Sequence, residues 1–162
     1  MNNEAREIAQ DSLTGKVPPR RVQIFRAGSF QFGVFEDEIA TIADWREPTP
    51  LPHAPASVIG VVGIQGRMLT VMNLNRLTGG VSADDSYRYI IALRGDEQLA
   101  LPASAIGEIV DYSHPDSENA KTGNESFVLG SFTQAGEETR ILNVRQLFPA
   151  ALQGRERRRR RF

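Results

Sequence analysis

The sequence has no cysteine, only two histidines and only one tryptophan among its 162 residues. The absence of cysteine excludes disulfides, thiolate nucleophiles and cysteine-ligated zinc, and it is consistent with a reducing, cytosolic compartment. His53 and His114 both lie next to prolines in polar stretches, and we expect both to be exposed to solvent. Because no nucleophile and base are suitably spaced, we expect no catalytic residue, no metal and no cofactor. The sequence is not that of an enzyme.

Long hydrophobic runs are also lacking. No run of eighteen apolar residues occurs, and the first residues, MNNEAREIAQDSL, contain acidic side chains but no apolar segment. We therefore expect neither a membrane span nor a secretory leader, and a cytoplasmic localisation. With 40% hydrophobic and 24% charged residues, the chain has the composition of an ordinary globular protein.

Charge is distributed unevenly along the chain. The last eight residues, RERRRRRF, hold six arginines, whereas residues 1–154 carry 13 basic and 19 acidic groups. The body is therefore acidic, and nucleic acid is not expected as its partner. We expect residues 153–162 to be a disordered tail. Three roles are considered for the tail, in order of preference: it keeps the protein soluble, it makes weak contact with an anionic membrane or an acidic partner, or it binds nucleic acid. The candidate anion contacts are Arg157, Arg158, Arg159, Arg160 and Arg161.

Most of the body alternates as β-strands do. In SFQFGVF (29–35), Phe30, Phe32 and Val34 recur at period two and predict one buried face. YRYIIAL (87–93) and QLALP (98–102) repeat this arrangement, and convincing helical periodicity is scarce. The sequence predicts an all-β fold after a flexible lead of residues 1–20.

An internal repeat links the two halves of the body. Shifting the chain by 67 residues aligns 28–44 with 95–111, and shifting it by 70 aligns 58–77 with 128–147. Identical pairs include Gly28 with Gly95, Gln31 with Gln98, Ile39 with Ile106, Ile42 with Ile109, Asp44 with Asp111, Gly60 with Gly130, Gly66 with Gly136, Asn73 with Asn143 and Leu77 with Leu147. We expect two similar β-units of about sixty to seventy residues, too small to be stable alone, that pack face to face around a shared core.

The glycines of GVVGIQGR (60–67) do not form a phosphate-binding loop. No lysine is present, and strand-like sequence continues directly after them. Gly66 suits a tight turn between two strands, VIGVVGI (58–64) and MLTVMNL (68–74). Gly60 lies within a strand and predicts close packing over that strand by the other half or by a partner.

The stretch LPHAPASVIGVVGIQGRMLTVMNLNRL (51–77) resembles the signature of the CheW-like domain of bacterial chemotaxis coupling proteins. The resemblance continues through FQFGVFEDEIATIAD (30–44) and FVLGSFTQAGEETRILNVRQLF (127–148), and we place the domain at residues 21–152. It implies two small five-stranded SH3-like β-barrels related by a pseudo-two-fold axis, with short helical segments.

The resemblance also implies a function. Proteins of this family are non-enzymatic adaptors that bind the regulatory domain of a CheA-type histidine kinase and the cytoplasmic tip of a chemoreceptor. Such an adaptor is cytoplasmic and reaches the inner membrane face through receptor complexes. The positions expected to border the partner groove are Gly60, Val62, Gln65, Gly66, Asn73 and Gly130.

Two of these positions depart from the family pattern. Gln65 stands where the family usually has arginine, and Asn73 where it usually has aspartate. The loss of both charges predicts a divergent chemotaxis, pilus or gliding pathway. If strand pairing brings the two residues close together, it also predicts a coupled change of partner specificity. The alternative is a tandem β-barrel peptide-binding module unrelated to chemotaxis, which would need an aromatic groove for proline-rich ligands. Trp45 is interpreted as a plug between the barrels rather than a contact residue.

Overall fold

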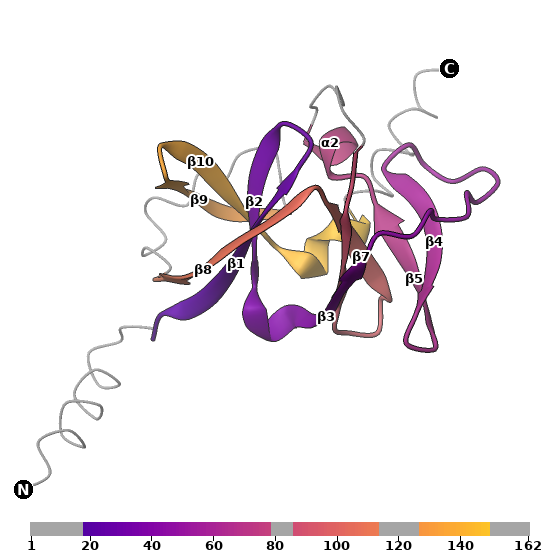
Figure 1. The fold of residues 1–162 in the computed structure, drawn as a ribbon, viewed down its shortest axis with the longest axis horizontal. Helices are drawn as coiled ribbons and strands as arrows, with labels where there is room; N and C mark the ends of the chain where they lie inside the picture. Colours follow the sequence, from indigo (N-terminus) through magenta and orange to yellow (C-terminus); the bar gives the residue numbers. More distant parts are fainter. Residues whose placement is uncertain (1–17, 79–85, 114–126, 150–162) are drawn as a thin grey trace, which may run out of the picture.

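The computed structural model describes residues 18–78, 86–113 and 127–149, and these residues form two five-stranded sheets (Figure 1). The first half supplies β1 (Arg20–Ala27), β2 (Phe30–Phe35), β3 (Ile39–Asp44), β4 (Val58–Ile64) and β5 (Arg67–Met72). The second half supplies β6 (Tyr89–Leu93), β7 (Leu99–Ala103), β8 (Ala105–Tyr112), β9 (Val128–Gln134) and β10 (Glu137–Leu142). The short helical segments are η1 (Glu36–Glu38), α2 (Leu74–Leu77) and residues 144–149.

The sheet topology confirms the repeat and corrects how it was expected to fold. One sheet has the order β8-β1-β2-β10-β9 and the other β3-β6-β7-β5-β4. Advancing every strand of the first sheet by one repeat gives the order of the second. Each sheet nevertheless contains strands from both halves, so the expectation that each repeat forms its own unit was wrong. Because neither half holds a complete sheet, the two halves must fold together.

Strand registers reproduce the two sequence offsets. The parallel pairing of β2 with β10 is repeated in that of β7 with β5. The partners are Phe32 with Arg140 and Gly33 with Ile141 in one sheet, and Leu99 with Thr70 and Ala100 with Val71 in the other. Both β4–β5 and β9–β10 are hairpins with one register irregularity, which falls beside Gly60 and Gly130.

The two hairpins turn in the same way. Gln65 and Gly66 have φ of 50° and 77°, and Ala135 and Gly136 have 53° and 78°. Two consecutive residues with positive φ define the two-residue turn whose twist matches that of the flanking strands. Gly66 therefore has the turn role that its sequence context predicted.

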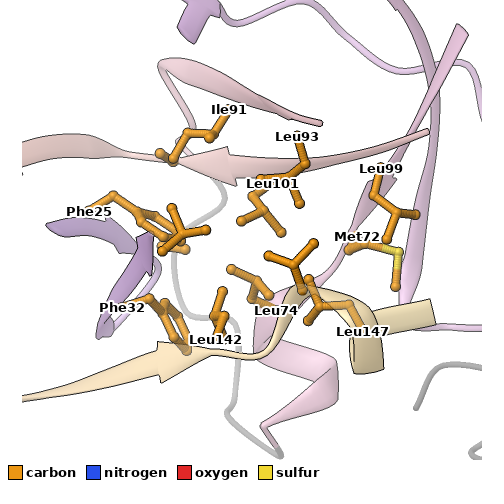
Figure 2. Close-up of a cluster of buried hydrophobic side chains, with 14 of the residues drawn as sticks. Phe25, Phe32, Met72, Leu74, Ile91, Leu93, Leu99, Leu101, Leu142 and Leu147 are labelled. Atoms are coloured by element: carbon orange, nitrogen blue, oxygen red, sulfur yellow. The ribbon is translucent and has the colours of Figure 1, made fainter. Parts of the chain in front are cut away.

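The largest cluster of buried side chains lies between the two sheets. Figure 2 shows Phe25 and Phe32 from one sheet converging with Ile91, Leu93 and Leu101 from the other, together with residues of α2 and the helix at 144–149. As predicted, Phe32 and Val34 are fully buried on one face of β2, with Phe30 packed against the same cluster. This shared core joins the two sheets into one domain.

Each sheet also curls around a smaller core of its own. One contains Val62, Ile64, Leu69, Val71, Ile90, Ala92 and Ala100, and the other Val22, Phe35, Tyr112 and Ile141. Trp45 packs against the first of these two cores, and its ring lies near that of Tyr87, with centroids 5.1 Å apart and the planes tilted by 43°. Trp45 therefore packs on the core of one barrel, whereas a plug between the two barrels was expected.

Candidate partner-binding surface

The β4–β5 hairpin has one buried and one open face. Leu69 and Val71 point into the barrel, whereas Met68 points outward and is 59% exposed, the largest value among the exposed large hydrophobic side chains of the described residues. Gly63 pairs with Met68 across the hairpin and is itself exposed. A Cβ on Gly63 would lie 3.7 Å from the Met68 sulfur, so the thioether extends across a strand that has no side chain there. The result is an exposed apolar patch without a charged side chain at its centre.

Arginines hold the two sides of this hairpin. Arg46 donates from Nη1 to the Gly63 carbonyl oxygen, at 3.0 Å. On the other side, Arg67 donates from Nη2 to the Gly95 carbonyl oxygen, also at 3.0 Å. Within the described ranges neither guanidinium lies within 4.0 Å of a carboxylate.

Gly60 is covered by its own chain. Thr49 forms a β-bridge with Val61, and a Cβ on Gly60 would fall well inside van der Waals contact of the Thr49 carbonyl oxygen. The close approach inferred from the sequence is real, but the segment around Pro48 and Thr49 makes it, not a partner. Val62 is only 6% exposed and points into the barrel, so its side chain shapes the hairpin from inside.

Gln65 and Asn73 lie at opposite ends of the hairpin. Gln65 is at the turn beyond the Ile64–Arg67 pair, whereas Asn73 follows Met72, the partner of Val58. Six strand residues separate them, about 20 Å at the usual rise of a strand. The condition for a coupled pair, that strand pairing brings the two departures close together, is therefore not met.

Asn73 has a local role. Its side-chain oxygen accepts a hydrogen bond from the Arg76 backbone N–H, at 3.2 Å, and caps α2. Asparagine and aspartate serve about equally well as helix N-caps, so this position tolerates the exchange without reference to a partner. The signal was present in the sequence, as an asparagine directly before the short segment LNRL, which begins and ends with leucine.

The remaining predicted residues lie apart from one another. Gly66 is exposed at the hairpin turn, and Gly130 lies in the other hairpin, where a Cβ would be 2.9 Å from the Tyr112 hydroxyl oxygen. His53 is exposed, as expected. His114 and the tail arginines lie outside the described residues.

The β9–β10 hairpin has the same backbone arrangement as the β4–β5 hairpin but carries different side chains. The burial pattern of β10 is identical to that of β5, but Glu137 and Glu138 replace Arg67 and Met68. Glu137 forms a salt bridge with Arg26, and Thr133 is the cross-strand partner of Glu138. The outward face of this hairpin is therefore polar and charged.

A second charged region lies where β1 meets η1. Arg20 pairs with Asp37 at 2.7 Å, Arg21 pairs with Glu36 at 3.0 Å, and the Arg20 guanidinium lies 3.5 Å from the centroid of the Phe35 ring. Burial raises the pKa of Glu38, and nearby Arg20 partly opposes this. The arginines and carboxylates of this region pair with one another, so this region is a weaker candidate for binding a charged ligand.

The described residues contain no group of three or more side chains suited to a metal ion. In the same part of the chain, no helix has the length and apolar character needed to cross a membrane.

Comparison with known proteins agrees with this architecture. The family model described as the CheW-like domain matches residues 21–152. The chain belongs to the CheW-like domain family, a family of adaptor and scaffold proteins of chemotaxis.

Two named relatives share this family. The chain is 26% identical over 137 residues to a protein of Rhizobium meliloti (strain 1021) called chemotaxis protein CheW, covering 81% of this chain and 88% of that protein. It is 32% identical over 72 residues to a probable chemotaxis protein CheW of Rhizobium etli, covering 44% of this chain and 46% of that protein.

A solved structure has the same fold. The crystal structure of the scaffolding protein TtCheW from Thermoanaerobacter tengcongensis matches with a TM-score of 0.65 at 19% identity, over 80% of this chain and 92% of that one. The predicted all-β fold of two five-stranded barrel-like units is thereby confirmed, with the exchange of strands described above.

Proposed function

We propose that this protein is a non-enzymatic adaptor that couples the regulatory domain of a CheA-type histidine kinase to the cytoplasmic tip of a chemoreceptor-like protein. The observation that carries the proposal is the CheW-like family match over residues 21–152, together with a fold that spans the same range. An adaptor needs two separate docking surfaces on one rigid body. The shared core supplies the rigid body, and the open faces of the two sheets supply surface for more than one partner.

The β4–β5 hairpin is the best candidate for one docking surface. It combines an exposed Met68 with Arg46 and Arg67, whose guanidinium groups are already held by backbone carbonyls. Methionine and arginine are enriched at the centres of protein interfaces, and ordered side chains lose less entropy on binding. Gln65 and Gly66 at the turn, and Gly130 in the other hairpin, remain proposed contacts.

The pathway is proposed to be a divergent chemotaxis, pilus or gliding pathway. The support is Gln65, which replaces the arginine of the family pattern with a neutral amide at an exposed turn. Asn73 no longer supports it, because it serves as a helix cap.

The binding test uses purified kinases and receptor fragments encoded in the same genome. Immobilised full-length protein should retain at least one kinase regulatory domain and one receptor fragment, and Met68→Glu should weaken one of these by at least tenfold. Glu138→Lys is the matched control on the other hairpin. A folded protein that retains no kinase and no receptor would refute the adaptor function.

The adaptor would be cytoplasmic, and it would reach the inner membrane face through its receptor. The arginine tail would add a weak contact with anionic lipid, of about 1 kcal/mol per arginine near the surface. Deleting residues 155–162 should abolish binding to anionic vesicles at low salt and leave kinase binding unchanged. Equal vesicle binding by both forms would reduce the tail to a solubility feature.

A further inference from the structure

The open face of the β4–β5 hairpin is self-complementary. Three features follow one another across it: Arg46 beyond the edge of β4, then Gly63 and Met68 paired in the hairpin, then the loop that joins β6 to β7. That loop is placed beside β5 by two hydrogen bonds. They are Thr70 N–H to the Gln98 carbonyl, at 2.8 Å, and Arg67 to the Gly95 carbonyl.

The loop carries exposed acidic side chains, Asp96 and Glu97. The hairpin therefore has Arg46 on one side, an uncharged centre, and on the other side two carboxylates, Asp96 and Glu97, in the same loop whose Gly95 carbonyl binds the Arg67 guanidinium. Figure 1 shows the β4–β5 turn and the β6–β7 turn side by side at the same end of the molecule.

We propose that two copies of this chain associate through this face, about a two-fold axis that runs along the strands between β4 and β5. In a two-fold contact, each residue of one copy faces the residue of the second copy that the two-fold rotation places opposite it. The rotation places Met68 of each copy over Gly63 of the other. It also brings Arg46 of each copy opposite Asp96 and Glu97 of the other.

The apolar centre suits this exchange. Met68 already covers the bare backbone of Gly63 in its own chain. Methionine is flexible, so its thioether can leave its own Gly63 for that of the second copy. The centre carries no charge, so the two copies do not repel each other where they are closest.

The β9–β10 hairpin cannot associate in the same way. The pair equivalent to Gly63 and Met68 is Thr133 and Glu138. A two-fold contact there would bring the two Glu138 carboxylates together and leave no bare strand to receive them. The contact we propose is narrow, because it involves two strands and a loop, and we expect a weak dimer below the standard interface of about 800 Å² per partner.

Cysteine trapping tests the geometry directly, because the natural chain has no cysteine. One chain carries Gly63→Cys and a second, tagged chain carries Met68→Cys; they are mixed under a mild oxidant. The matched control mixes Thr133→Cys with Glu138→Cys, the equivalent positions of the other hairpin. The first mixture should give at least ten times more mixed disulfide than the control. Equal yields from the two mixtures would overturn the proposal.

Sedimentation of the full chain provides the second measurement. Met68→Glu and Arg46→Glu should each weaken self-association at least tenfold, and Glu138→Lys should leave it unchanged. Adding Glu97→Arg to Arg46→Glu should restore association, because the two residues face each other across the axis. A monomer at all concentrations, or the same weakening by Glu138→Lys, would contradict the dimer. Kinase and receptor binding are measured separately, because the same face is the proposed docking surface and only one partner can occupy it at a time. A chain that stays monomeric but retains the kinase would contradict the dimer and leave the adaptor function standing.

Discussion

The two hairpins of this protein, β4–β5 and β9–β10, share a backbone and differ in chemistry. Both turn through two residues of positive φ, and both have the same sequence of buried and exposed positions in the second strand. The first presents Met68 and Arg67, the second Glu138 and Glu137. The two copies therefore share the pattern of buried and exposed positions and differ in the side chains that they present outward. An adaptor can gain distinct docking surfaces in this way without changing its fold.

The barrel interiors give the largest expected contrast. Leu69 is buried in one barrel, and Thr139, its equivalent, is buried in the other, where its hydroxyl accepts a hydrogen bond from Gln31 at 2.6 Å. Leu69→Ala should cost about 3 kcal/mol of unfolding free energy through lost burial and a cavity. Thr139→Val should cost about 1 to 2 kcal/mol because the Gln31 amide loses its partner. Urea unfolding measures both, and equal losses would show that the two interiors do not differ as described.

The paired glycines give the next contrast. Gly60→Ala should cost about 2 kcal/mol, because the new methyl group meets the Thr49 backbone, which cannot move without breaking its bridge to β4. Gly130→Ala should cost less than about 1 kcal/mol, because its neighbour is the end of the Tyr112 side chain, which can shift. Thermal unfolding of both variants is the measurement. A greater loss at Gly130 would contradict this account of the two sites.

Asn73 separates local structure from partner recognition. Asn73→Ala should cost about 1 kcal/mol by removing the cap of α2, whereas Asn73→Asp should stay within about 0.5 kcal/mol of the parent. Partner affinity should be unchanged in Asn73→Asp, as measured by titration with the kinase or receptor fragment. A large change in affinity with unchanged stability would show that Asn73 contacts the partner.

The smallest effect concerns Glu38, which the second half replaces with Ala105 at the equivalent position. Burial raises the pKa of Glu38 above its ordinary 4.5, so the folded state holds this proton more tightly than the unfolded chain does. Stability is then lost as the pH rises from 4.5 through the raised folded pKa. Glu38→Gln should remove that loss. Urea unfolding at pH 4.5 and pH 7 measures it, with Glu97→Gln as a control in an exposed loop. An unchanged pH dependence in Glu38→Gln would contradict the prediction.

Much of the fold could be predicted from the sequence because the repeat was still visible. The two offsets found by aligning glycines and asparagines also relate the β2–β10 pairing of one sheet to the β7–β5 pairing of the other. Gly66 was correctly recognised as a turn residue. The exchange of strands could not be predicted, because alternation gives the faces of a strand but not its neighbours. The parallel pairing of β2 with β10 joins residues more than a hundred positions apart.

The candidate surface was harder to predict. Gly60 gave a correct signal of close packing, but only the structure shows that Thr49 provides it. Met68 was not among the predicted contact residues. Its place between Leu69, which points inward, and the turn at Gly66 would have indicated an outward position at period two.

The most direct test of the adaptor function is a reconstituted kinase assay with a receptor fragment and a CheA-type kinase from the same genome. Autophosphorylation is measured with and without this protein, in the presence and absence of the receptor. We predict that kinase activity responds to the receptor only when this protein is present, and that Met68→Glu reduces the response more than Glu138→Lys does. An identical receptor response with and without the folded protein would contradict the adaptor function.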